Sequence, residues 1–225
     1  MKRITIASLL AIFSFTTASA EVGINVGVSG QIGLFAASAT ELDVGTHGTT
    51  SGTDEKNRES DFIGLGYHSV FIEKSFGDRL FLGLDYVPEA LETEESSTVV
   101  IERENEPASY TQQTNKVQVD FNDLTTVYLG LQVTEGMYVK AGMMSVDIQT
   151  NEVLGSGSTY GNTSMDGVMY GFGWHMENDS GVFLRAEGSV MDFDGASVTS
   201  ANGVNKITLD KLDGGSVKAS IGKAF

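Results

Sequence analysis

A regular alternation of apolar and polar residues is the feature that most constrains this sequence. From Val22 to Ala36, aliphatic residues recur at nearly every second position, and glycine, asparagine, serine and glutamine lie between them. Because successive side chains of a β-strand point to opposite faces, this period of two predicts a strand with one apolar and one polar face. The pattern recurs in seven later segments, near residues 63–71, 80–86, 124–133, 138–143, 167–175, 182–190 and 216–225. Tilted strands of about ten residues are long enough to cross a bilayer.

The segments between these strands alternate between short turns and long polar stretches. The short ones, residues 75–79, 134–136 and 177–181, contain the turn-forming sequences F-G-D, E-G and N-D-S-G. The long ones lie near residues 37–61, 88–122, 147–166 and 192–206. Short periplasmic turns and long extracellular loops are typical of outer-membrane barrels. The sequence therefore predicts an all-β fold, an eight-stranded antiparallel up-and-down transmembrane β-barrel with long extracellular loops and both termini in the periplasm.

One detail of this prediction has an alternative. Residues 98–101 and 116–121 are expected to extend the third and fourth strands beyond the membrane as a hairpin, whereas the alternative makes residues 98–104 and 112–121 a further membrane hairpin, which gives ten strands. Pro88 and the dense glutamates that follow it oppose the second reading, because charge on a lipid-facing surface is costly. Residues 205–212 are expected to extend the last strand, with a β-bulge near residues 213–215.

The first twenty residues have the pattern of a secretory signal peptide. Lys2 and Arg3 precede an almost wholly apolar stretch over residues 4–13, and Ala18-Ser19-Ala20 forms an A-x-A cleavage site. We therefore assign residues 1–20 to a cleaved signal peptide and residues 21–225 to the barrel domain. The whole chain carries a net charge of −16 and has no cysteine. This charge excludes nucleic acid as a main partner, since phosphate backbones require a cationic surface.

The polar face of the strands is interpreted as the lumen. A lipocalin-like soluble barrel would have the reverse arrangement, with an apolar interior. Small residues on the polar face leave room for large polar ones in a narrow barrel, and twelve glycines are assigned to it: Gly23, Gly27, Gly33, Gly64, Gly66, Gly83, Gly130, Gly142, Gly167, Gly171, Gly173 and Gly222. The predicted lumen network is His68, Asp85, Lys140, His175, Arg185, Glu187 and Lys218. Buried charges must pair, so the network is expected to plug the barrel; the alternative is a narrow ion path.

The apolar face carries aromatic residues that suit a membrane interface. We predict that Phe71, Tyr86, Tyr170 and Trp174 face the lipid and contribute to interfacial aromatic girdles.

Three short motifs carry a resemblance to a known family. Phe225 is the last residue, and Ile221, Ala219 and Val217 precede it at alternating positions; residues 137–142 and 184–188 follow tight turns. In these features the chain resembles the small OmpA-like outer-membrane β-barrel proteins of Gram-negative bacteria. The resemblance implies insertion by the barrel-assembly machinery, which reads the terminal strand, and surroundings of outer-membrane lipid and lipopolysaccharide. Lys223 departs from the family pattern, which usually has an apolar residue there, and no peptidoglycan-binding domain is expected after Phe225.

Several functions are compatible with such a barrel. We expect a non-enzymatic outer-membrane protein with a structural or surface-interaction role, without cofactor, metal or catalytic residues. The alternatives are a narrow porin-like diffusion channel and, less favoured, a lipid-modifying enzyme of the outer membrane. His68 and Ser69 do not make a catalytic dyad, because neighbouring side chains of a strand point to opposite faces. The many acidic residues of 88–123 are interpreted as a solvated loop, with shared divalent cations as the alternative. The sequence assigns no surface partner.

Overall fold

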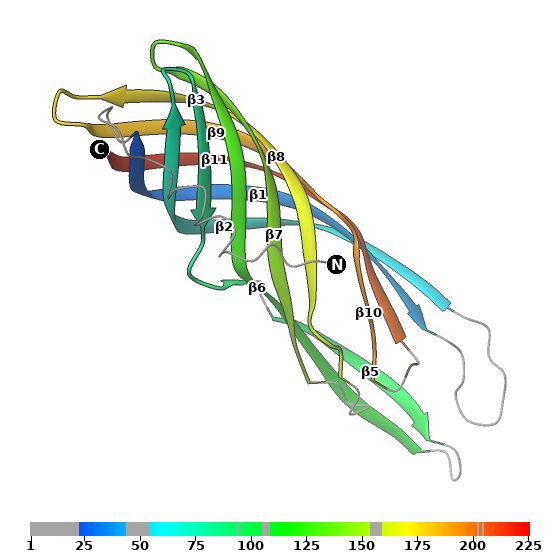
Figure 1. Cartoon of the computed structure of the whole chain (residues 1–225). Coiled ribbons are helices and arrows are strands. Elements are labelled where there is room, and N and C mark those ends of the chain that lie inside the picture. Colours follow the sequence, from blue (N-terminus) through cyan, green and yellow to red (C-terminus); the bar gives the residue numbers. More distant parts are fainter. Residues whose placement is uncertain are drawn as a thin grey trace.

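The protein is a closed, all-β barrel (Figure 1). The computed structural model describes residues 23–43, 55–93, 95–104, 109–153, 159–201, 203 and 205–225. The wall strands are β1 (Ile24–Asp43), β2 (Glu55–Phe76), β3 (Leu80–Tyr86), β6 (Ser109–Thr134), β7 (Met137–Val153), β8 (Thr163–Glu177), β9 (Val182–Phe193) and β11 (Asn205–Ala224). All neighbours pair antiparallel, and β1 pairs with β11 to close the ring. The predicted eight-stranded up-and-down barrel is confirmed.

One end of the barrel consists of the three predicted short turns. Gly77, Gly136 and Gly181 have φ values of 62°, 86° and 79°, a conformation that glycine adopts without strain. The start of β1 and the end of β11 meet at this same end, where Phe225 N donates to Ile24 O at 2.9 Å. We call it the short-turn end. The predicted signal peptide, residues 1–20, lies outside the described residues.

The opposite end is built mainly of strands where the sequence suggested loops. β1 and β2 stay paired as far as Asp43 and Glu55, and β5 (Ser96–Glu104) pairs with the start of β6. Two short strands, β4 (Leu91–Glu92) and β10 (Ala196–Thr199), also pair with β6 and β11. The β5–β6 hairpin therefore extends the third and fourth wall strands, and the ten-strand alternative is wrong.

A β-bulge interrupts β11, as expected, but at a different position. Lys211 lies opposite Ser38 and Leu209 lies opposite Ala39, so Asp210 is the extra residue. The bulge lies three residues before the predicted segment, 213–215, which is paired in regular register. Phe35 lies against Gly214, where a Cβ atom would overlap its ring.

The half of the barrel next to the short turns, which we call the lower half although Figure 1 draws it at the top, has an apolar exterior and a polar interior. We call its outer band of apolar side chains the apolar belt; its most exposed members include Val28, Ile32, Leu129, Val139, Tyr170, Phe172, Trp174, Leu184 and Val217. Soluble monomers rarely expose apolar surface this continuous. Such a belt is what a barrel presents to lipid.

The structure corrects the predicted faces of β2. Phe71, assigned to lipid, points inward and is buried, as is Tyr67, whereas His68, Gly64 and Gly66, assigned to the lumen, face outward. The reason is steric, since the Phe71 ring fills the space that Gly27 leaves free on β1. Gly83 and Gly130 admit the rings of Tyr128 and Phe81 in the same way. The lumen thus takes up several of the largest side chains, and not only polar ones.

The polarity of the two faces reverses above the apolar belt. On β7, Lys140 points inward and Met143 outward, but farther along Val146 and Ile148 point inward and Asp147 outward. The same reversal holds at Phe121, Met165, Phe193 and Leu212, which point inward beside outward polar neighbours. We call this part of the barrel, with β10, the upper wall. Outside it, the carboxylate of Asp213 raises the pKa of the exposed Lys211. The upper wall therefore has the apolar interior and polar exterior of a water-exposed barrel.

Within the described residues, no helix is long and apolar enough to cross a membrane.

Candidate functional site: the charged lumen

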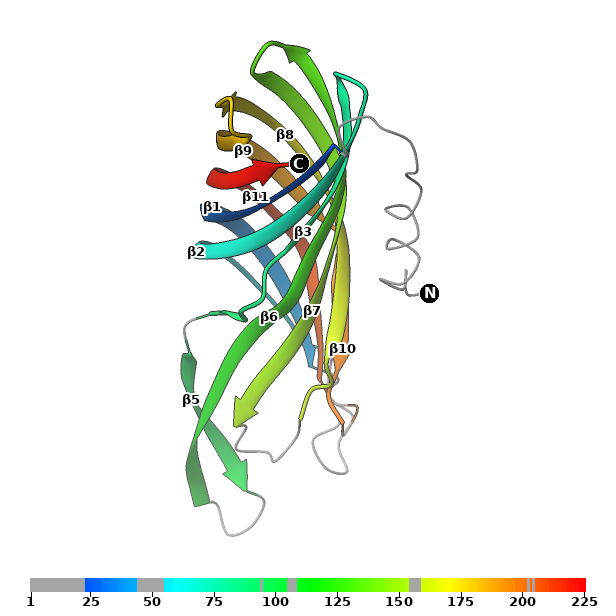
Figure 2. The same ribbon diagram turned by 60° about the vertical axis from the view of Figure 1, so that its left-hand side comes forward.

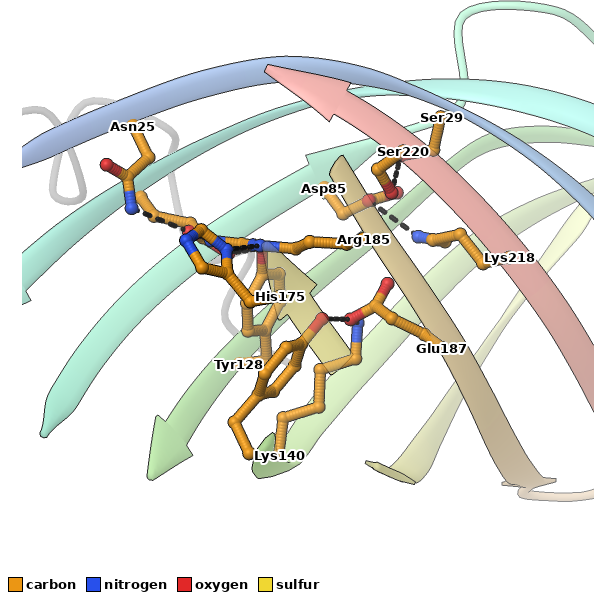
Figure 3. Close-up of polar contacts among 12 residues, drawn as sticks. Asn25, Ser29, Asp85, Tyr128, Lys140, His175, Arg185, Glu187, Lys218 and Ser220 are labelled. Carbon is orange, nitrogen blue, oxygen red and sulfur yellow. Dashed lines mark hydrogen bonds and ion pairs between the residues drawn. The ribbon is translucent and has the colours of Figure 1, made fainter. Parts of the chain in front are cut away.

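Six charged side chains converge inside the lower half of the barrel, and Figure 3 shows most of them. Three are cations and three are anions: Lys140 on β7, Arg185 and Glu187 on β9, Lys218 on β11, Glu73 on β2 and Asp85 on β3. None of their side chains is more than 11% exposed. Formal charges in this set balance, as a space almost closed to water requires.

The centre of the network is a two-pronged ion pair between Arg185 and Glu73. The two terminal guanidinium nitrogens donate to the two carboxylate oxygens at 2.5 and 2.7 Å. Tyr128 Oη donates to Oε1 at 2.7 Å, and Asn25 donates to Oε2 at 3.2 Å. Glu73 is 0% exposed, so these bonds replace all of its contact with water. Such paired geometry is the strongest form of the arginine–carboxylate contact.

Aromatic rings surround the arginine. The guanidinium carbon of Arg185 lies 4.6 Å from the ring centre of Phe183 and 5.5 Å from those of Phe71 and Tyr138. Rings at this distance attract a cation with their negative faces. Arg185 Nε also donates to Nδ1 of His175 at 3.0 Å, and Nε2 of His175 lies 3.1 Å from Glu177. The guanidinium of Arg185 is thus held by two strands, β2 through Glu73 and β8 through His175.

Two further ion pairs extend the network across the lumen. Lys140 Nζ lies 2.6 Å from Glu187, whose carboxylate also accepts a hydrogen bond from Tyr138 at 2.7 Å. Lys218 Nζ donates to Asp85 at 2.7 Å. Each pair joins strands that do not neighbour each other along the ladder, so the network fixes the barrel across its interior.

The network leaves little free space. The cavity that touches Asp85, Lys140, Glu187 and Lys218 has a volume of about 30 Å³. A water molecule needs roughly 10–15 Å³ by this measure. The cavity at this level has room for about one or two water molecules.

Sequence reasoning assigned all members of this network to the lumen except Glu73, and it included one residue that is not there. His68 lies on the outer face, where its Nδ1 is 3.7 Å from Glu89. Both errors come from the reversed faces of β2. The charge count of the predicted lumen could have revealed Glu73, because three predicted lumen cations were matched by only two predicted anions. A third carboxylate was needed, and Glu73 has the alternating position that supplies it.

The remaining predicted residues fall mostly on the outer face. Tyr86, Tyr170 and Trp174 point outward, and Tyr86 Oη donates to Asp123 at 2.6 Å. Phe71 is the exception described above. In the terminal strand, Val217, Ala219, Ile221 and Phe225 are exposed on the apolar belt. Lys223 reaches Ser180 O at 3.2 Å, at the short-turn end. Their predicted roles as an aromatic girdle and an assembly signal remain predictions.

Among the residues that the structure describes, no three His, Asp or Glu side chains are placed to hold a metal ion. His68 and Ser69 point to opposite faces, since Ser69 is buried at 1% exposure inside the barrel.

Neither a protein-family model nor a curated protein matches the sequence. Among solved structures, the chain is similar to the outer membrane protein OprG from Pseudomonas aeruginosa, with 16% identity and a TM-score of 0.41 over 88% of this chain and 96% of that chain. It is similar to Ail, the attachment invasion locus protein of Yersinia pestis, with 11% identity and a TM-score of 0.41 over 88% and 99%. A third similar structure is the outer membrane protease OmpT from Escherichia coli, with 10% identity and a TM-score of 0.45 over 93% and 99%. The chain thus has similarity to small outer-membrane barrels of Gram-negative bacteria, at levels that assign it no function.

Proposed function

We propose that the protein is a non-enzymatic outer-membrane β-barrel with a plugged lumen and a structural or surface-interaction role. The observation that carries this proposal is the charge-balanced network, which leaves about 30 Å³ of free space at its level. The apolar belt supports insertion in lipid, since charged side chains fill the inside and apolar ones cover the outside. The upper wall then stands outside the membrane, and the short-turn end with both chain ends lies in the periplasm.

The surroundings of the barrel follow from this placement. Outer-membrane lipid contacts the apolar belt, and lipopolysaccharide faces the acidic residues at the base of the upper wall. The barrel-assembly machinery inserts the chain. Recovery of the mature protein from the soluble periplasmic fraction without detergent would overturn the membrane placement. A mobility shift between unboiled and boiled samples in detergent is the result that agrees with it.

Planar-bilayer recordings test the plug. We expect the purified wild-type protein to show no steady conductance, because the ion pairs of Arg185 and Lys140 block the lumen. Arg185→Ala is expected to open intermittent conductance by removing the central side chain. The matched control is Lys223→Ala, which removes an exposed cation on the outer face. Steady wild-type channels whose conductance changes with Lys140→Ala would establish the narrow-channel alternative instead.

Deleting Phe225 is expected to impair assembly in cells more than it impairs the stability of the folded barrel. The residue is 59% exposed, and its loss removes backbone hydrogen bonds to Ile24, which together contribute about 1–2 kcal/mol. Assembly is measured as the fraction of heat-modifiable protein in outer membranes, and stability as the free energy of unfolding in lipid vesicles. Phe62→Ala, which removes another exposed phenylalanine, serves as control. Normal insertion of the truncated chain would contradict the role of the terminal strand as a signal.

A further inference from the structure

The upper wall encloses an apolar pocket that the charged network does not explain. Its volume is about 560 Å³, within the range of roughly 300–1,000 Å³ that small-molecule sites occupy. Aliphatic and aromatic side chains from six strands line it, among them Ala37, Leu65, Phe121, Ile148, Val198 and Leu209. Polar residues cover most of the outside of the same strands, with Phe62 of β2 as an exposed apolar exception, so this apolar interior is largely set apart from the apolar belt that faces lipid.

The pocket is closed below by a layer of packed side chains. Leu212 lines the pocket and Met144 lines the small cavity of the charged network, and both are buried in one cluster with Met165 and Phe193 that connects the two spaces. Methionine is flexible and polarisable, and it adapts to the shape of an apolar ligand. A compound that enters the pocket therefore meets an apolar floor and not the ion pairs.

The barrel wall is interrupted beside the pocket. β3 pairs with β2 only from Val70 to Phe76, and β4 and β5 pair with β6 alone. Residues 55–69 of β2 thus have no strand partner on that side among the described residues. Figure 2 shows β2 and β6 diverging beyond β3. Ile63 and Leu65 line the pocket from one side of this seam, and Thr93 and Phe121 line it from the other. The seam offers a lateral entrance.

The polar groups of the pocket select the charge of a ligand. Asp61 and Glu92 contribute carboxylates to the lining, with hydroxyls from Thr93, Thr150 and Ser197. Within the described residues, the lining contains no lysine or arginine. A carboxylate or phosphate head group would meet repulsion, whereas an ammonium group would be attracted and hydrogen-bonded.

We propose that this pocket binds single-chain amphiphiles with an alkyl tail and an ammonium head group. The tail occupies the apolar interior above the methionine floor, and the head group lies at Asp61 and Glu92. The proposal deepens the surface-interaction role and rests on that proposed function only for the placement of the upper wall outside the membrane. A barrel that conducts ions could still bind such a ligand, so the two proposals fail separately.

Methionine-methyl NMR of the barrel in phospholipid nanodiscs tests the site with dodecylammonium as the probe. Met144 and Met165 lie in the floor, whereas Met137, Met143 and Met176 are exposed on the outer face and report partitioning into lipid. We expect saturable shifts at the floor methyls and only linear, non-saturable shifts at the outer ones. Dodecanoate is expected to cause no saturable shift. Saturation with dodecanoate at equal affinity would overturn the head-group assignment, and no saturation with either probe would overturn the pocket.

Two pairs of variants localise the binding. Ala37→Phe fills the pocket and is expected to weaken dodecylammonium binding at least about tenfold, whereas Ala36→Phe points outward and is expected to leave it unchanged. Glu92→Gln is expected to weaken binding several-fold, and Glu89→Gln, outside the lining, serves as its control. Heat-modifiability of each variant verifies that it has folded. Equal effects of Ala36→Phe and Ala37→Phe would contradict the proposed location.

Discussion

Glu73→Gln is expected to lower the free energy of unfolding of the barrel by about 3–5 kcal/mol, the largest effect of any single change considered. Glutamine keeps the shape of the side chain and its hydrogen bond to Tyr128, but it leaves the guanidinium of Arg185 buried without a counter-charge. Water cannot replace that charge, because Glu73 is fully buried and the rings of Phe71 and Phe183 close around the guanidinium. Reversible unfolding of the protein in lipid vesicles by urea measures the effect.

A double-mutant cycle separates the ion pair from general damage to the lumen. Combining Glu73→Gln with Arg185→Met removes both charges and places an apolar chain among the surrounding rings. The double variant is expected to be more stable than the sum of the single effects predicts, because no unpaired charge remains. Glu135→Gln, at an exposed position in a short turn, is the control and should change the free energy of unfolding by less than about 0.5 kcal/mol. If the two single changes in the free energy of unfolding simply added in the double variant, the contributions of Arg185 and Glu73 to stability would be independent of each other.

Leu129→Arg is expected to cost about 2–4 kcal/mol of folding free energy in a bilayer. Leu129 is the middle one of five outward-facing residues on β6, between Thr125 and Val133, and it is 54% exposed. An arginine there lies far from both membrane surfaces, so its charge must pull water or head groups into the lipid. The same unfolding experiment measures the cost.

The matched control for Leu129→Arg lies on the upper wall. Ser145→Arg changes an exposed, outward-facing residue on β7 above the apolar belt and is expected to be nearly neutral. The same variant is also compared in detergent micelles. There the loss of folding free energy caused by Leu129→Arg should be smaller, since a micelle deforms more easily than a bilayer. A neutral effect of Leu129→Arg in vesicles would mean that the apolar belt does not face lipid.

Much of the charged lumen could be predicted from alternation alone. Lys140 and Arg185 lie among glycines and outward aliphatic residues, so their faces are unambiguous in the sequence. On β2 the rule failed, because aromatic residues occupy the inward positions and glycines the outward ones. Tyr67 and Phe71 therefore looked lipid-facing, and Glu73 was missed with them. Aromatic residues suit either a lipid interface or a narrow lumen beside glycine, and the residue type does not distinguish the two.

The upper wall was the other part that local patterns described poorly. Segments such as residues 37–43 and 55–61 are polar enough to resemble loops, yet they are paired strands. Alternation continues through them, but the apolar side chains change from the outer face to the inner one as the strands leave the apolar belt. The sequence of one strand contains the switch, as at Met143 and Met144, where two adjacent methionines face lipid and lumen in turn.

The sequence by itself determined the number of strands, the three tight turns, the closed antiparallel order and most of the lumen charges, because each depends on a local period or a local turn. The tertiary structure decided which face of β2 points inward, how Glu73 completes the charge balance, and where β2 and β6 diverge beyond the end of β3, beside an apolar pocket. These features depend on neighbours that are distant in the chain: a ring needs a glycine on the next strand, a buried charge needs its counter-charge, and a pocket needs several strands to leave the same space unfilled.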